Sequence, residues 1–288
     1  MEETPVLAII GGSGIYSMPD LENTREHDLD TPFGKPSAPV VTGTLEGKPV
    51  AFLARHGIGH HISPTELNSR ANIYALKLLG VKQIVSISAC GSLREDYAPG
   101  HIVIPDQLFD FTRDRKRTFF EGGLVSHIGV ADPFCLDLAE MTYQAVQKTG
   151  ATTHKGGVFI TIEGPRFSTR AESNVFRSWG MALVGMTASP EAFLAREAEI
   201  CYCTMAHVTD FDSWHMSKEP VTVEMVIRVL NQNTAYAQQA VRNLVKMLDG
   251  QRECEHHHAL KDAIITHPDR VHPQARQRLD LLVGKYLK

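Results

Sequence analysis

The sequence lacks the usual marks of a membrane or secreted protein. No stretch approaches the roughly 20 apolar residues that a membrane helix needs. The N-terminal Met-Glu-Glu-Thr-Pro also has none of the basic residues that begin a signal peptide. The 5 cysteines are an odd number at irregular spacing, which favours free thiols in a reducing compartment over a disulfide framework. We therefore expect a cytoplasmic protein with no membrane partner.

An excess of positive charge is also lacking. The chain has 29 Lys and Arg against 33 Asp and Glu, a net charge of −4, which argues against a nucleic-acid partner held through its phosphates. Hydrophobic residues make up 43% and charged residues 22%, values that exclude a disordered chain. A chain of 288 residues buries roughly three quarters of its unfolded surface, so it needs neither a disulfide nor a metal to fold.

Strand and helix patterns alternate over most of the length. Runs of β-branched and apolar residues predict strands at Val6–Ile10, Val50–Leu53, Gln83–Ser88, His101–Ile104, Gly157–Ile162, Leu183–Met186 and Cys201–Val208. Helical periodicity and end signals predict helices from the capping box Ser63-Pro64-Thr65-Glu66 to Gly80 and over Leu136–Lys148, Ser189–Glu199 and Val221–Leu248. This alternation predicts an α/β fold around a central sheet, and no repeat or linker divides its core.

A glycine-rich segment follows the first strand. In Gly11-Gly12-Ser13-Gly14 the glycines let the backbone approach an anion, and Ser13 adds a hydroxyl donor. The dinucleotide-binding pattern is incomplete, because Ser17 stands where its third glycine is needed and Pro19 interrupts the helix that should follow. A Walker A loop is excluded because no Gly-Lys-Ser/Thr follows. The segment is an anion loop of another kind or a tight turn.

Two other strand ends carry polar or reactive residues. Arg55-His56 follows the second strand, where an arginine can fork onto phosphate oxygens, although an isolated arginine more often forms a surface ion pair. A zinc site at His56, His60 and His61 is disfavoured, since there is no HExxH pattern and no nearby thiolate. Cys90 ends the third strand among small residues and is interpreted as a buried structural cysteine.

Later loops gather further polar residues. Glu163–Phe167 places an acid, an arginine and an aromatic ring in one Gly-Pro turn, and Thr187 precedes a helix start where it could donate to an anion. Asp210 and Asp212 follow the apolar strand Cys201–Val208. Paired carboxyl groups can accept from an amine or, when protonated, donate to a ring nitrogen. Taken alone, the pair also fits an Asx turn with a helix-capping acid.

Seven motifs occur together in a characteristic order. They are Gly11-Gly12-Ser13-Gly14, Arg55-His56-Gly57, Asn68-x-x-Ala71-Asn72, Ala89–Glu95, Glu163–Ser168, Gly185-Met186-Thr187 and Asp210–Trp214. In this order the chain resembles the trimeric purine nucleoside phosphorylase family, in particular the branch that acts on methylthioadenosine, over roughly residues 5–267. The resemblance implies a single domain of the nucleoside phosphorylase fold, with a central mixed, partly barrel-like β-sheet flanked by helices. It also implies a homotrimer with its sites near subunit interfaces.

The resemblance further implies phosphorolysis. Phosphate attacks C1′ of methylthioadenosine and releases adenine and 5-methylthioribose 1-phosphate, with phosphate as co-substrate and no cofactor or metal. Carried over by position, the phosphate-binding residues are Ser13, Arg55, His56, Ser88, Ala89 and Thr187. The substrate-binding residues are Phe167, Ser168, Met186, Asp210, Asp212, Val223 and His127, the last donated by a neighbouring subunit. Asp210 and Asp212 are the expected catalytic residues, acting at the purine N7 and the 6-amino group respectively.

Other functions are weighed against this one. A phosphorylase for 6-oxopurines or methylthioinosine is disfavoured, because a carbonyl needs a donor where Asp210 and Asp212 offer acceptors. A nucleosidase would not need Arg55, His56 and Thr187. A non-catalytic nucleoside-binding protein is a third alternative, and a zinc hydrolase is disfavoured because no ligand set is apparent.

The C-terminal part of the chain departs from the motifs. We expect residues 1–267 to form the catalytic domain, with a core over 5–250 and an extension over 251–267, and residues 268–288 to form a tail of unknown role. Ile264-Ile265 is predicted to close the pocket for the 5′ substituent. The pattern Cys254-x-His256-His257-His258 fits a solvated loop better than a metal site, and the basic run Arg113–Arg117 is also interpreted as a solvated loop.

Overall fold

A mixed β-sheet organises the part of the chain that the computed structural model describes, residues 3–11, 18–215, 222–250 and 252–287. Within that part the sheet has 11 strands, eight of them in the order β2-β3-β4-β1-β5-β10-β9-β7. Those strands are β1 (Leu7–Gly11), β2 (Glu22–His27), β3 (Val40–Leu45), β4 (Lys48–Ala54), β5 (Gln83–Ser92), β7 (Gln107–Phe111), β9 (Val158–Ile162) and β10 (Met181–Gly185). The others are β6 (Ile102–Ile104), β8 (Thr153–Lys155) and β11 (Cys201–Asp210).

The ten-residue strand β5 pairs with three other strands of this sheet. It pairs in parallel with β1 and β11, and its last residues pair antiparallel with β10, where Leu183 lies opposite Ser92. Because β1, β4, β5 and β11 run in parallel, their carboxyl ends reach the same edge of the sheet. The residues that follow these strands are thereby brought together, as ligand-binding residues are in other α/β sheets.

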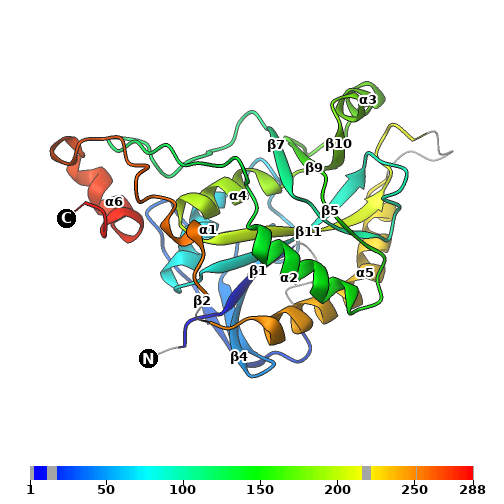
Figure 1. Ribbon diagram of the computed structural model, residues 1–288, viewed down its shortest axis with the longest axis horizontal. Helices are drawn as coiled ribbons and strands as arrows, with labels where there is room; N and C mark the ends of the chain where they lie inside the picture. Colours follow the sequence, from blue (N-terminus) through cyan, green and yellow to red (C-terminus); the bar gives the residue numbers. More distant parts are fainter. Residues whose placement is uncertain (1–2, 12–17, 216–221, 251, 288) are drawn as a thin grey trace.

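Helices cover both faces of the sheet (Figure 1). They are α1 (Ser69–Leu78), α2 (Leu136–Gln147), α3 (Arg170–Ser178), α4 (Ala188–Glu197), α5 (Val223–Met247) and α6 (Pro273–Val283), with short 3-10 helices η1 (Glu255–His258) and η2 (Pro268–Arg270). Alternate residues of β1 enter different cores, as the pleat of a strand requires: Ile10 belongs to the core that includes residues of α1, α4 and α6, and Ile9 belongs to the core that includes residues of α2 and α5. None of the described helices is long and apolar enough to span a membrane.

Most of the predicted elements are confirmed, but one helix start was placed too early. Only half of the expected capping box forms: the Glu66 carboxylate accepts from the Ser63 backbone N–H at 3.2 Å and from the Ser63 hydroxyl at 2.5 Å, whereas the Glu66 N–H donates to the Ser63 carbonyl at 3.1 Å. These bonds close only a turn. The helix starts at Ser69, because Asn68 caps it by accepting a hydrogen bond from the N–H of Ala71 at 3.2 Å.

The end of the chain packs on the core instead of extending into solvent. Leu279, Leu282 and Val283 of α6 are buried among residues of α1 and the segment around Phe119. Figure 1 shows α6 beside α1, at the opposite end of the molecule from α3. The domain boundaries expected from the sequence remain predictions, but residues 273–283 are part of the folded body.

Candidate functional site

A cavity of about 510 Å³ lies at the sheet edge where β5, β10 and β11 end. Its size and its mixture of apolar walls with a few polar groups are typical of a small-molecule site. Its lining consists of Arg55, His56, His60, Pro64, Ile87, Ser88, Ala89, Cys90, Gly91, Ile162, Pro165, Phe167, Ser168, Val184, Gly185, Met186, Thr187, Thr209, Asp210, Asp212, Val223, Val226, Ile227 and Asn231.

Nearly all the residues expected from the sequence line this one cavity. Two do not. Ser13 lies outside the described residues. His127 is not among the lining residues, and its backbone N–H donates to the carbonyl of Ala263 at 2.8 Å. Ile264 forms an isolated bridge with Ser126 and is likewise absent from the lining of its own chain's cavity.

Arg55 lines the cavity, but its guanidinium is already held by protein groups. The residue is 1% exposed, and its Nε donates to Glu191 Oε1 at 2.5 Å. Its Nη2 donates to Glu191 Oε2 at 3.2 Å and to Ser86 Oγ at 2.6 Å, and its Nη1 donates to the Ile87 carbonyl at 3.1 Å. The guanidinium therefore makes with the Glu191 carboxylate the bidentate interaction that was expected with phosphate. Such a buried pair fixes the end of β4 against β5 and α4.

His56 stands beside this ion pair and is uncharged at neutral pH. Burial and the positive charge of Arg55 lower the pKa of His56 to about 4, although a backbone hydrogen bond to Ile62 opposes this. Its Nδ1 lies 2.9 Å from the Ile62 carbonyl, so Nδ1 carries the proton of the neutral ring and Nε2 is an acceptor. The ring stacks on His60 with 4.2 Å between centroids.

A pair of hydroxyl groups lines the same end of the cavity. Ser88 Oγ and Thr187 Oγ1 are 3.1 Å apart, and both residues are buried. Thr187 is the N-cap residue of α4 but makes no side-chain capping bond. Its hydroxyl is therefore available to a ligand. The regular turns of α4 begin only after Ser189, whose φ of −102° and ψ of 135° are not helical, so it is the two hydroxyl groups that make this end of the cavity suited to an anion.

The two aspartates form the other polar end. Asp210 ends β11, just after the pairing with β5 shifts register beyond Val208. Its carboxylate accepts from the Thr209 hydroxyl and from the Asp212 backbone N–H, each at 2.7 Å. Burial raises the pKa of Asp210 against the effect of these two bonds.

Asp212 is a buried carboxyl group with an unused acceptor. Burial, together with the charge of Asp210, raises the pKa of Asp212 to about 6. Its Oδ2 is buried with no hydrogen-bond partner in the described part of the chain. An unsatisfied buried acceptor costs free energy unless a ligand supplies a donor. The pair is thus easier to protonate than exposed carboxyl groups, and its free oxygen can accept from an amine.

Gly91 makes room for this pair. A Cβ at this position would lie 3.0 Å from Asp210 Oδ1, 3.0 Å from Asp212 Cβ and 3.1 Å from Val184 Cγ1. Only glycine lets β5 pass so close to both acids. The small residues noted at the end of this strand therefore have a structural reason, because they allow the aspartates to pack against the backbone.

The mouth of the cavity is apolar. Phe167, Val223 and Ile227 are 37%, 62% and 50% exposed, respectively. Met186 lies deeper, beneath Gly164, whose φ is +69° and whose added Cβ would meet the methionine sulfur at 2.6 Å. This wall favours an apolar substituent over a polar one.

Arg115 is a site-building residue that the sequence analysis missed. Its side chain is 4% exposed, which corrects at this one position the solvated loop expected for Arg113–Arg117, whose other four residues are exposed. The guanidinium donates to the carbonyls of Met186 at 2.6 Å, Ser189 at 2.7 Å and Glu163 at 2.7 Å, and it pairs with the Glu163 carboxylate at 3.2 Å. It thus ties together two loops of the cavity.

No sequence signal singled out these supporting groups. A basic run with no periodicity gives no reason to bury one arginine of the five-residue segment. Glu191 follows Pro190 at a helix start, where an acid is expected for capping alone. Cys90 is confirmed as buried, at 4% exposure, and its Sγ lies 3.5 Å from the His207 carbonyl, although it also touches the cavity.

The comparisons with known proteins agree with this geometry. A family model described as the phosphorylase superfamily matches residues 6–246. The chain belongs to the phosphorylase superfamily. Among relatives in this superfamily, the S-methyl-5′-thioadenosine phosphorylase of Chloroflexus aurantiacus is 53% identical over 97% of this chain and 98% of its own. That of Geobacter sulfurreducens is 51% identical over 98% and 99%.

Solved structures of the superfamily share the whole fold. A methylthioadenosine phosphorylase sourced from an Antarctic soil metagenomic library has a TM-score of 0.93 at 44% identity, with 98% of this chain and 99% of that chain covered. A methylthioadenosine phosphorylase from Schistosoma mansoni in complex with adenine has a TM-score of 0.84 at 36% identity, covering 88% and 96%. The chain thus has the nucleoside phosphorylase fold expected from its sequence.

Proposed function

We propose that the protein catalyses the reversible phosphorolysis of 5′-methylthioadenosine to adenine and 5-methylthioribose 1-phosphate. One observation carries the proposal: a single cavity has an anion-binding end at Ser88 and Thr187 and a paired-acid end at Asp210 and Asp212. These are the two groups of residues that a phosphate and an adenine base need. The full-length similarity to phosphorylases named for this nucleoside supports the assignment.

At the anion end, phosphate binds beneath the sugar. The hydroxyls of Ser88 and Thr187 donate to its oxygens. His56 Nε2 accepts from a protonated phosphate oxygen, since Nδ1 holds the proton of the neutral ring. Arg55 acts by holding this wall together with Glu191.

At the base end, the acids make adenine a better leaving group. A phosphate oxygen forms a bond to C1′ while the bond from C1′ to N9 breaks, and its electron pair moves into the purine ring. Asp210 passes a proton to N7, which neutralises that charge, and Asp212 Oδ2 accepts from the 6-amino group. Burial raises the pKa of both aspartates, that of Asp212 to about 6, which makes the protonated form of this pair more accessible than for an exposed carboxyl group.

The apolar mouth receives the methylthio group. Phe167, Val223 and Ile227 offer carbon surface and no charge. Burying a methylthio group instead of a hydroxyl there favours the thioether by about 1–3 kcal/mol. We therefore expect adenosine to be a weaker substrate than methylthioadenosine.

The active assembly is inferred to be a homotrimer in which His127 reaches a neighbouring site. The loop that carries His127 exposes Val125 at 45%, and Ile265 beside it is 62% exposed, so this surface is suited to a subunit contact. Light scattering should give three times the 31.9 kDa of one chain, and a monomeric mass in active protein would refute the trimer. The 5 free cysteines support a reducing, cytoplasmic location.

The reaction is tested by following phosphorus and base together. Incubation with methylthioadenosine and inorganic phosphate should convert one phosphate into a sugar phosphate ester, seen by phosphorus NMR, for each adenine released. Omission of phosphate should abolish adenine release. Release without phosphate, yielding free methylthioribose, would identify a nucleosidase and overturn the proposal.

A further inference from the structure

Four metal-ligating side chains gather at a place remote from the cavity. Cys135 immediately precedes α2, Cys201 opens β11, and Cys254 and His256 lie at the start of η1. Their ligand atoms all lie within 4.8 Å of one another. None of the four belongs to the described lining of the cavity. The proposed reaction therefore gives no reason for their proximity.

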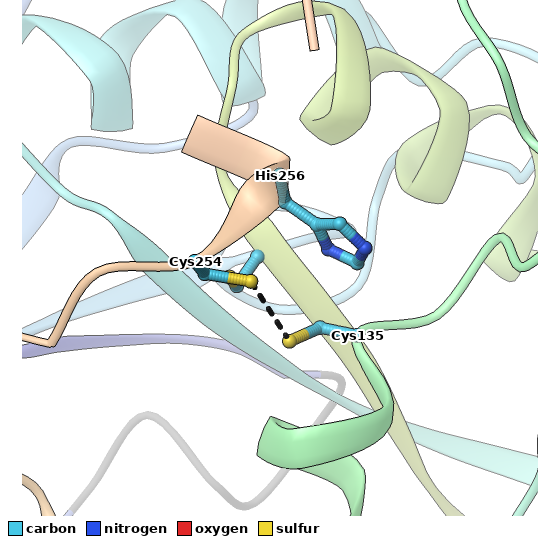
Figure 2. A group of neighbouring side chains, drawn as sticks. Cys135, Cys254 and His256 are labelled. Atoms are coloured by element: carbon cyan, nitrogen blue, oxygen red, sulfur yellow. Dashed lines mark hydrogen bonds between the residues drawn. The ribbon is translucent and has the colours of Figure 1, made fainter. Parts of the chain in front are cut away.

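The burial of this Cys3His cluster corrects the solvated loop expected around Cys254. His256 is 5% exposed, and Cys135 and Cys201 are each 1% exposed. Figure 2 shows the side chains of Cys135, Cys254 and His256 directed toward a common point, with the two sulfurs joined by the dashed line. A sequence pattern around Cys254 alone could not show this, because the other two thiols come from distant segments.

The spacing fits a metal ion better than a disulfide. The sulfurs of Cys135 and Cys254 are 3.8 Å apart. A disulfide needs about 2.05 Å. Two thiolates bound to zinc at about 2.3 Å with a tetrahedral angle lie about 3.8 Å apart. Three cysteines and one histidine are also one of the usual ligand sets of structural zinc.

Neighbouring groups provide the support that thiolate ligands require. His257 Nε2 lies 3.3 Å from the Lys82 carbonyl, which only accepts, so this nitrogen carries a proton, and it lies 3.5 Å from Cys201 Sγ. It can therefore donate to a Cys201 thiolate, as groups around zinc sites commonly do. Cys135 lies at the N-terminus of α2, where the helix dipole stabilises a thiolate.

A fixed cation balances the remaining charge. Zinc with three thiolates and a neutral imidazole carries a net charge of −1. The Arg196 guanidinium interacts electrostatically with all three cysteines of the cluster. It is held in place by donating to the carbonyls of Gly129 at 3.2 Å and Asp132 at 2.6 Å.

We propose that Cys135, Cys201, Cys254 and His256 bind one structural zinc ion. Protein ligands occupy all four tetrahedral positions, which leaves none for a water or a substrate, so the ion is structural rather than catalytic. Binding releases the thiol protons to solvent and joins α2, β11 and the segment after α5. The zinc thereby anchors residues 252–287, including the Ala263 carbonyl that receives the N–H of His127.

The first test is the metal content of untagged protein purified without chelator. Elemental analysis should find about one zinc per chain. Protein refolded with Co²⁺ should show the thiolate charge-transfer and intense visible absorption of a tetrahedral cobalt site. Zinc-free native protein that gives no such spectrum would refute the site, and so would a Cys135–Cys254 disulfide found by mass spectrometry of native protein.

Matched variants locate the ligands. His256→Ala should lower zinc content at least tenfold, whereas His258→Ala, at an exposed side chain two residues away, should keep it. Cys254→Ser should likewise lose zinc, whereas Cys203→Ser, at a buried cysteine outside the cluster, should keep it. Chelator should lower the thermal midpoint of the parent and of His258→Ala by more than about 5 °C and leave His256→Ala unchanged. Zinc retained by His256→Ala and Cys254→Ser would overturn the assignment, and the cobalt spectrum of the parent decides if either variant fails to fold.

Discussion

Replacing Asp210 by asparagine isolates the proposed proton transfer to the purine. The fold can accommodate the amide. Its oxygen can accept from the Asp212 N–H, and its NH2 group can face the Thr209 hydroxyl. That hydroxyl lies 3.2 Å from the Cys90 carbonyl and can donate there instead. We therefore expect Asp210→Asn to fold with a thermal midpoint close to that of the parent.

The expected loss of activity follows from what an amide cannot do. Proton transfer from a positioned acid contributes about 10²–10⁴-fold to a rate. An asparagine cannot supply that proton to N7, so kcat/KM for methylthioadenosine should fall about 10³-fold. Its NH2 group can donate to N7 of either base, but it can also donate to the neighbouring O6 of a 6-oxo base, which accepts where a 6-amino group does not, so the loss for methylthioinosine should be less than about tenfold. The ratio of the two kcat/KM values should therefore shift about 10²-fold toward the 6-oxo substrate.

The assay compares initial rates of base release from both nucleosides at saturating phosphate and pH 7. Asp96→Asn serves as the control, because the Asp96 side chain is 58% exposed and pairs only with Arg94 among the described residues. That variant should match the parent for both substrates. An Asp210→Asn variant that loses less than threefold with methylthioadenosine, or loses equally with both nucleosides, would refute the role given to Asp210.

Three further predictions concern the groups around the cavity. Asp212→Asn should lower activity but raise the free energy of unfolding at pH 7 by up to about 3 kcal/mol. The pKa of Asp212 is about 6 in the folded parent against an ordinary 3.8, so the parent loses stability as pH rises between these values, whereas an asparagine does not ionise. In urea unfolding this gain should vanish near pH 4, and a gain that persists there would contradict the burial argument. Glu191→Gln should lower the free energy of unfolding in urea by about 3–5 kcal/mol, because it leaves Arg55 buried without its counter-charge. A decrease below about 1 kcal/mol would mean that this ion pair does not stabilise the fold. Gly91→Ala should raise the KM for the nucleoside about tenfold and leave the KM for phosphate unchanged. Gly129→Ala is the control, because there is open space at its Cβ position, and it should change neither KM. Equal effects of Gly91→Ala on both KM values would contradict the placement of Gly91 beside the two aspartates.

The sequence predicted what depends on local pattern and on strand ends. Apolar runs such as Cys201–Val208 were placed correctly because a strand buried on both faces needs them. The residues after these strands, Thr187 and Asp210 among them, meet in one cavity because strand ends converge at one edge of the sheet. Family motifs sharpened this expectation to particular positions.

Long-range pairing lay beyond the reach of the sequence. No residue near Arg55 in the sequence indicates that its guanidinium forms an ion pair with Glu191. No residue of the basic run indicates that Arg115 is buried. The Cys3His cluster is the extreme case, because Cys135, Cys201 and Cys254 come from separate elements and only the folded chain brings them together. Such contacts depend on tertiary packing rather than on periodicity or spacing.

The most direct test of the account is the rate of base release from methylthioadenosine and methylthioinosine across a range of phosphate concentrations. Release from the 6-amino nucleoside should rise from zero and saturate with phosphate, and it should exceed release from the 6-oxo nucleoside at every concentration. A rate independent of phosphate would contradict the anion end of the cavity. A preference for methylthioinosine would contradict the roles given to Asp210 and Asp212.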